Sequence, residues 1–245
     1  MTEAEHYFKQ ALASFSELYD QPNLHSASVH NNYGLFLLLM ERPVDALSHL
    51  EIATGVAIDA FGRDDPRTLS AKLNLGYCYS LLDDPRAESL IRQVVSGRRA
   101  MGGETGGDVA VAIGVLSDHF RRTGQAEMAR AYSEQAMNMI ADLPDAPLHV
   151  AIGPSLHHAR NLAALGEHQS AQAVFEATWE VLTTVGPDTG HMSNRFVEAY
   201  SEWLAAHDPE RGRDVIETWL ATEQAQGSQQ TPPVQRLQHR LLELQ

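Results

Sequence analysis

Apolar positions recur with helical spacing along most of the chain, and the same arrangement returns about every 42 residues. The clearest copies lie in residues 28–53 and 67–95. Each has an apolar-periodic stretch with a central glycine, Gly34 or Gly76, and these two glycines are 42 residues apart. A short polar break with a proline follows in both, and then a second apolar-periodic stretch begins. Paired helical periods separated by polar breaks predict helical hairpins.

The same frame continues in both directions from these two copies. Gly124 and Gly166, also 42 apart, fall in the turns of two later hairpins. The second stretch of each hairpin carries a small, large, small pattern, and residues 4–11 show it without a first stretch before them. The sets are Ala4/Phe8/Ala11, Ala46/Leu50/Ala53, Ala129/Ser133/Ala136 and Ala171/Phe175/Thr178. A weaker copy at 191–225 holds Tyr200, Leu204, Ile216 and Trp219.

This pattern has a physical reason in close packing. Small residues at fixed positions let two antiparallel helices approach, and large residues fill the space between them. One hairpin cannot bury its apolar face alone, so we expect the units to stack. The predicted helices lie roughly at 2–19, 26–40, 43–61, 67–82, 85–100, 108–123, 125–141, 147–165, 167–184, 191–206, 209–224 and 232–244.

We expect two parts, a solenoid over residues 1–225 and a linker with a C-terminal capping helix over 226–245. The final helix is apolar at Leu237 and Leu241, and solenoid ends need a cap. The first helix stands alone, because in the repeat frame it is a second helix with no first one before it. Two interpretations stay open: a piece of a longer chain, or an N-terminal cap that begins at a Thr2–Glu5 capping box.

The residues at these repeat positions resemble the tetratricopeptide repeat. One copy carries Gly34, Leu37, Ala46, Leu50 and Ala53; the next carries Gly76, Tyr79, Ala87 and Ile91, with Val94 in place of the usual small residue. The period of 42, longer than the usual one of about 34, and the loop FGRDDPRT (61–68) are similar to the kinesin light chain subtype. The resemblance implies an all-α, right-handed α-solenoid of about five hairpins.

Charge and terminal composition narrow the partners and the location. The formal net charge is −14, which repels nucleic acid and anionic membrane, so neither is an expected partner. It favours a basic partner, or serves only solubility. The N-terminus is polar, and no apolar run reaches the ~18 residues of a membrane span. We therefore expect a cytoplasmic protein. Cys78, the single cysteine, fits a buried helical position.

No motif for catalysis, metal or a cofactor stands out, so we predict that the protein is not an enzyme. The segment GGETGG (102–107) lacks the Gly-Lys-Ser/Thr of a phosphate loop and is interpreted as a turn between hairpins. His157 and His158 are adjacent, so a helix directs them about 100° apart and they cannot chelate one ion together. Asp64/Asp65 and Asp83/Asp84 lie in turns and are expected to cap helices.

The partner-binding residues follow from the resemblance, which implies that the first helices of successive hairpins line a concave groove. Asn32 and Asn74 are 42 apart and could pair with a peptide backbone, or bind only water and neighbouring turns. The basic side chains in the middle of the chain would suit an acidic segment, against the basic partner that the net charge favours. The candidates are Asn31, Asn32, Leu35, Leu38, Asn74, Tyr77, Arg121, Arg122, His157, Arg160 and Arg195.

The resulting hypothesis is a non-catalytic interaction module that holds a peptide or helix of a partner protein in its groove. By resemblance it could belong to a bacterial signalling or regulatory protein. The alternative is a self-assembling structural or scaffold protein, a homo-oligomer that associates through the ends of its solenoid.

Overall fold

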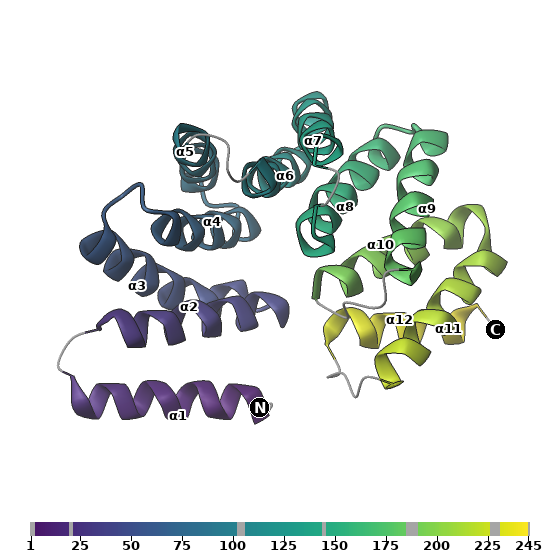
Figure 1. Ribbon diagram of the computed structural model, residues 1–245. Coiled ribbons are helices and arrows are strands. Elements are labelled where there is room, and N and C mark those ends of the chain that lie inside the picture. The colour runs from purple at the N-terminus through teal and green to yellow at the C-terminus, as the bar shows by residue number, and fades with distance from the viewer. Residues whose placement is uncertain are drawn as a thin grey trace. The chain divides into compact units, whose positions relative to one another are not determined.

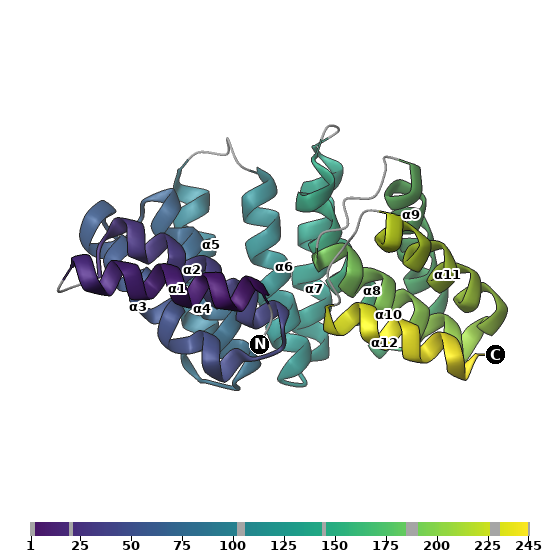
Figure 2. The same ribbon diagram turned by 90° about the horizontal axis from the view of Figure 1, so that it is seen from below.

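The computed structural model describes residues 3–19, 22–101, 106–143, 146–184, 191–225 and 231–244. These residues form twelve α-helices and no strand, so the predicted all-α repeat fold is confirmed. The chain divides into two compact units, unit 1 (Met1–Thr105) and unit 2 (Gly106–Gln245) (Figures 1 and 2). Unit 1 contains α1 (Glu3–Leu18), α2 (Leu24–Leu39), α3 (Pro43–Phe61), α4 (Pro66–Leu81) and α5 (Arg86–Ala100). Unit 2 contains α6 (Gly106–Arg122), α7 (Ala126–Ala141), α8 (Leu148–Ala164), α9 (His168–Thr184), α10 (His191–His207), α11 (Pro209–Ala225) and α12 (Pro232–Glu243).

Two helices begin two residues earlier than the periodicity predicts. α2 starts at Leu24 because Asn23 caps it: the Asn23 side chain accepts hydrogen bonds from the backbone N–H groups of His25 and Ser26 at 2.9 and 3.2 Å. α6 starts at Gly106, so the turn interpretation of GGETGG is wrong for its last two residues. A Cβ on Gly107 would lie 2.7 Å from Val150 of α8, so the bare glycine lets α6 start beside that helix. Residues 102–105 and Thr2 lie outside the described residues.

The turns use the residues that the sequence singled out. Gly124 and Gly166 have φ of +75° and +77°, a left-handed conformation that glycine adopts without strain, and each follows the first helix of its hairpin. Asp65 accepts the Arg67 backbone N–H at 2.9 Å, and Asp84 does the same for Arg86 at 2.9 Å. The expectation of helix capping is confirmed for Asp65, which is the N-cap of α4. The N-cap of α5 is Pro85, so Asp84 lies one position before it, and Asp64 and Asp83 lie in the turns.

Each first helix packs on the second helix of its own hairpin: α2 on α3, α4 on α5, α6 on α7, α8 on α9 and α10 on α11. The glycines of the repeat sit at these contacts. A Cβ on Gly34 would lie 2.6 Å from the Leu50 side chain, and one on Gly76 would lie 2.8 Å from Ile91. Leu50 and Ile91 are both fully buried. The proposed reason for the small and large pattern is therefore confirmed, because the glycine makes room for the large residue opposite.

Each unit has its own apolar core. In unit 1, Tyr33, Leu37, Leu50 and Tyr79 pack together, and Cys78 is fully buried there as predicted, with its thiol pKa raised to about 11 by burial. In unit 2 the core continues through α8 to α12, and its members include Phe175, Phe196, Tyr200, Trp219 and Leu237. Through Leu237, α12 packs on α10 and α11. None of the helices in the described part of the chain combines the length and apolarity needed to cross a membrane.

Candidate functional site

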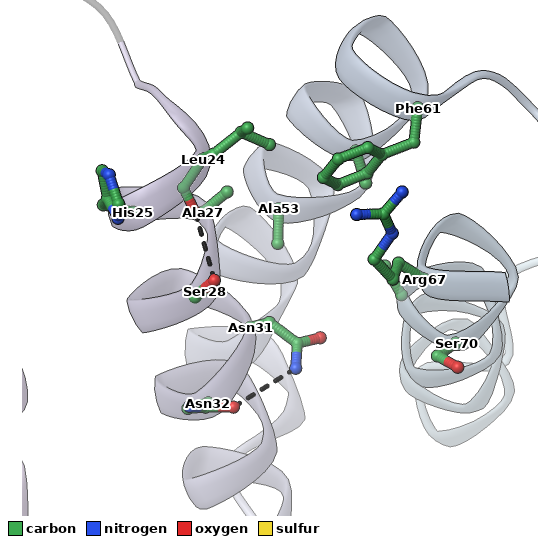
Figure 3. Close-up of a pocket in the computed structure, with 12 residues that line it drawn as sticks. Leu24, His25, Ala27, Ser28, Asn31, Asn32, Ala53, Phe61, Arg67 and Ser70 are labelled. Atoms are coloured by element: carbon green, nitrogen blue, oxygen red, sulfur yellow. Dashed lines mark hydrogen bonds between the residues drawn. The ribbon is translucent and has the colours of Figure 1, made fainter. Parts of the chain in front are cut away.

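A cavity of about 480 Å³ opens in unit 1 between α2, α3 and α4. Its apolar surface comes from alanines, one leucine and one phenylalanine, and its polar groups come from the first helices α2 and α4 (Figure 3). The apolar lining comprises Leu24, Ala27, Ala53, Ala57, Phe61 and Ala71, and the polar lining comprises His25, Ser28, Asn31, Asn32, Arg67 and Ser70. The cavity therefore combines space for an apolar side chain with hydrogen-bonding groups at its edge.

The three asparagines predicted to bind a partner are joined by hydrogen bonds. The Asn74 amide donates to Asn31 Oδ1 at 3.1 Å, across from α4 to α2, and the Asn31 amide donates to Asn32 Oδ1 at 3.4 Å (Figure 3 shows the second bond). Asn32 is exposed, whereas Asn31 and Asn74 are half-buried. The structure thus brings Asn31, Asn32 and Asn74 together along two neighbouring first helices.

Arg67 closes one edge of this cavity with a fixed geometry. Its guanidinium lies over the Phe61 ring, 3.4 Å from the ring centroid, and bonds both carboxylate oxygens of Asp65 at 2.8 and 2.9 Å (Figure 3 shows Arg67 beside Phe61). The same hydrogen bonds from Arg67 lower the Asp65 pKa to about 2. Because the two charges compensate each other, the cavity edge presents hydrogen-bonding groups with little net charge.

The other predicted residues of unit 1 differ in exposure. Leu35 and Tyr77 are half-buried. Leu38 is only 7% exposed and belongs to the core with Tyr33 and Leu37. Leu38 is therefore not part of the exposed surface of α2. Among the cavity-lining residues of α3, the sequence pattern identified Ala53 only as a packing position, and it did not single out Ala57.

In unit 2, α8 packs against both α6 and α10, and charged side chains gather along these three first helices. Asp118 of α6 is 1% exposed; Arg121 donates to it at 2.7 Å, and His157 Nδ1 of α8 lies 3.4 Å from it. Burial alone would raise the Asp118 pKa, but His157 and Arg121 hold it well below its ordinary value. Burial lowers the pKa of His157, which is 4% exposed, so this residue supports Asp118 from within rather than facing solvent.

Arg160 lies one helical turn after His157, half-buried among other charged groups. The pKa of Arg160 is lowered, mainly by burial and next by the positive charge of Arg195 on α10. Within the described residues, the Arg160 side chain has no hydrogen-bond or ion-pair partner. Glu198 of α10, by contrast, accepts a bond from Arg236 of α12 at 2.9 Å. Arg122 is exposed at the end of α6. This surface therefore places a half-buried cation without a partner beside further arginines.

No group of three or more histidine, cysteine, aspartate or glutamate side chains within the described ranges is arranged to hold a metal ion. The resemblance also places Asp118 and Glu198 on the concave face, although neither is among the candidate partner-binding residues. Each lies three residues from an arginine in the sequence, Arg121 or Arg195. That spacing on a helix was the signal available for finding them.

Comparison with known families identifies the repeat. A model of the tetratricopeptide repeat matches residues 25–100, which span the hairpins α2–α3 and α4–α5. Residues 25–100 carry tetratricopeptide repeats. The kinesin light chain subtype that the 42-residue period suggests stays a resemblance. Tetratricopeptide repeats generally mediate protein–protein interaction, and a fold of this kind is typically non-catalytic.

Two solved structures illustrate the similarity of these repeats. A kinesin light chain protein of Podosopora anserina with nearly identical TPR-like repeats is 16% identical, with a TM-score of 0.54 over 81% of this chain and 95% of that chain. BtubC (BKLC) from P. vanneervenii is also 16% identical, with a TM-score of 0.64 over 84% of this chain and 82% of that one. At these identities the similarity shows the fold alone. No curated protein matches the chain in sequence.

Proposed function

We propose that the protein is a non-catalytic interaction module that binds an extended segment of a partner protein along its first helices. The observation that carries this proposal is the hydrogen-bonded series Asn74, Asn31 and Asn32, of which Asn31 and Asn32 line the unit 1 cavity. It joins two successive first helices, which is the direction in which an extended segment would run across the repeats.

The asparagine series retains hydrogen-bonding capacity for a ligand. A primary amide has two N–H donors and an acceptor oxygen with two lone pairs. The two bonds in the series use one N–H of Asn74, one N–H of Asn31 and one lone pair on each acceptor. The remaining groups can pair with the N–H and C=O of a peptide backbone. An apolar side chain of the same peptide would occupy the neighbouring cavity between Ala53, Ala57 and Phe61.

On unit 2 we propose contact with an acidic segment. Arg160 is half-buried, next to the positive charge of Arg195, and lacks an ion-pair partner within the described residues. An oxyanion on the partner would relieve this repulsion and bond to the guanidinium in a bidentate manner. The local positive charge thus favours an acidic segment, although the net charge of the chain is −14.

The test is a random peptide display library selected on the full chain, followed by calorimetry on the selected peptides. We expect dissociation constants of about 1–100 μM, which is about −8 to −5.5 kcal/mol. The double substitution Asn31→Ala with Asn74→Ala should weaken a unit 1 peptide at least about tenfold, since it removes the paired amides. Ser48→Ala, at an exposed position of α3 outside the cavity, is the matched control.

For unit 2, the selected peptides should be enriched in aspartate and glutamate, and Arg160→Gln should weaken their binding about tenfold or more. Arg160→Lys should weaken it less, because the charge remains. Arg99→Gln, an exposed arginine at the end of α5, should leave binding unchanged. Peptides that bind equally well to all these variants, or a library that yields no binder, would contradict the proposal.

A further inference from the structure

The N-terminal helix α1 has an apolar stripe that its neighbour in unit 1 leaves accessible. Ala4, Tyr7, Ala11, Phe15 and Leu18 recur at spacings of three and four, so they lie on one side of the helix. Tyr7 is 58% exposed and Leu18 is 72% exposed, while Ala4, Ala11 and Phe15 are half-buried. We call these five residues the α1 stripe.

A different side of α1 attaches it to α2 (Figure 1). Phe8 stacks on Tyr33 of α2 with ring centroids 5.2 Å apart. Glu5, only 5% exposed, accepts a hydrogen bond from the Tyr33 hydroxyl at 3.3 Å and lies 3.2 Å from the Arg42 guanidinium. These contacts of Phe8 and Glu5 fix the orientation of α1 on α2. The α1 stripe, on a different side of the helix, is therefore not turned toward α2.

The 42-residue repeat shows what packs against the equivalent positions of a later helix, α3. The positions 42 residues after Ala4, Ala11 and Phe15 are Ala46, Ala53 and Ala57 of α3, which are 0%, 3% and 8% exposed. The position 42 after Tyr7 is His49, whose Nδ1 lies 2.7 Å from His30 Nδ1 of α2. At Ala46 and His49 this side of α3 thus meets the helix α2, and Ala53 and Ala57 line the cavity between α2, α3 and α4. The α1 stripe is therefore suited to receive a helix.

We propose that α1 of a second copy of this chain packs antiparallel on the α1 stripe about a two-fold axis. With Ala11 on the axis, Ala11 of one copy faces Ala11 of the other. Phe15 then faces Tyr7 of the second copy, and Leu18 faces Ala4 of the second copy. The small alanine at the centre lets the helices approach, and large residues meet aromatic or small ones, so the stripe is complementary to itself.

Charge permits this arrangement. The stripe contains no charged residue, and Glu3 lies at its margin near one end of α1. In the antiparallel pair the two copies of Glu3 lie at opposite ends, about 24 Å apart along the helices, which is beyond the Debye length of ~8 Å at physiological salt. Two chains of net charge −14 still repel each other at long range, so salt should strengthen this association rather than weaken it.

Analytical ultracentrifugation of the full chain over a range of concentrations tests the proposal. The wild type should form a dimer, and raising the salt concentration should lower its dissociation constant. Ala11→Glu should raise the dissociation constant at least about tenfold, since it places two like charges at the axis. Val44→Glu is the control, because Val44 is a 74% exposed apolar residue of α3 outside the stripe. A dimer unaffected by Ala11→Glu overturns the proposal.

Cross-linking tests the two-fold axis itself. Because residue 11 faces its own copy, Ala11→Cys should form a disulfide-linked dimer under mild oxidation, whereas Ala13→Cys, exposed elsewhere on α1, should not. Cys78 is fully buried, and Cys78→Ser removes it as a competing thiol. Equal cross-linking at both positions overturns the arrangement. A chain that stays monomeric overturns the dimer and leaves the stripe to a helix of another protein or of a preceding segment.

Discussion

At the scale of single residues, the packing of the repeat depends on helical glycines, which have no Cβ. Gly34 and Gly55 are both helical glycines of unit 1, on α2 and α3. A Cβ on Gly34 would come within 2.6 Å of Leu50, which is fully buried and cannot move aside, whereas Gly55 has nothing within 4 Å of that position. The same substitution therefore has opposite consequences at the two sites.

We predict that Gly34→Ala lowers the free energy of unfolding by about 1–3 kcal/mol, because the added methyl group forces α2 away from α3. Gly55→Ala should raise it by up to about 1 kcal/mol, since alanine restricts the unfolded chain and meets open space. Urea denaturation followed by circular dichroism measures both. Similar effects for the two variants would contradict the packing explanation.

Two histidines form a second residue-scale feature. His30 Nδ1 of α2 and His49 Nδ1 of α3 are 2.7 Å apart, so one ring must donate its hydrogen to the other. Burial lowers the pKa of both imidazoles, and the charge of His49 lowers that of His30 further. The folded chain therefore binds a proton at this pair less readily than the unfolded chain does.

The sign of the pH effect follows from these lowered pKa values. This pair's contribution to the free energy of unfolding should be complete above the ordinary histidine pKa of about 6.5 and should fall as the pH drops below it. We predict that the difference between wild type and His49→Gln shrinks between about pH 7.5 and 5.5. Urea denaturation at several pH values tests this, with His149→Gln at an exposed position as control. If the difference in free energy of unfolding between wild type and His49→Gln stayed constant with pH, the histidine pair would not be the source of the pH effect.

At the scale of elements, α12 is attached to unit 2 by one apolar side and by arginines. Leu237 is fully buried against α10 and α11, whereas Leu242 of the same helix is 68% exposed. Arg236 bonds Glu198, and Arg240 donates to the Glu198 carbonyl oxygen at 3.1 Å. In the structure, α12 thus packs on the last hairpin, α10–α11, while its role as a cap stays a prediction.

We predict that Leu237→Ala lowers the free energy of unfolding of unit 2 by about 2–4 kcal/mol, through lost burial and the cavity that remains. Leu242→Ala should change it by less than about 0.5 kcal/mol, because that side chain is already in water. Tryptophan fluorescence during urea denaturation reports on this unit, since Trp179, Trp203 and Trp219 all lie in it. Equal effects of the two substitutions would show that α12 is not seated through Leu237.

At the scale of the whole molecule, the net charge and the local charge point to different partners. The chain carries −14, yet α6, α8 and α10 gather Arg121, Arg160 and Arg195 beside the buried Asp118. Net charge is a sum over all residues, whereas a partner meets one surface. This is why the basic partner favoured by the total and the acidic segment favoured by Arg160 are not equivalent hypotheses, and why the peptide selection distinguishes them.

The sequence by itself determined the helices, their order and their pairing into hairpins. These features depend on local chemistry that repeats: helical spacing of apolar residues, glycines in left-handed turns, aspartates and prolines at helix starts, and, in the hairpins of unit 1, a glycine opposite a large residue. The repeating pattern also predicted the tetratricopeptide repeat, whose family model matches residues 25–100. Such signals survive in the sequence because they act between residues a few positions apart or at a fixed register.

Only the tertiary structure decided which of the candidate residues are exposed and which are buried. Leu38 and Asn32 lie on the same first helix, yet Leu38 is buried in the core and Asn32 is exposed. Asn74 reaches Asn31 across two helices, and His157 turns inward to Asp118. The physical reason is that burial depends on how neighbouring helices cross, and that crossing is set by side chains far away in the sequence, beyond the reach of any single helix's periodicity.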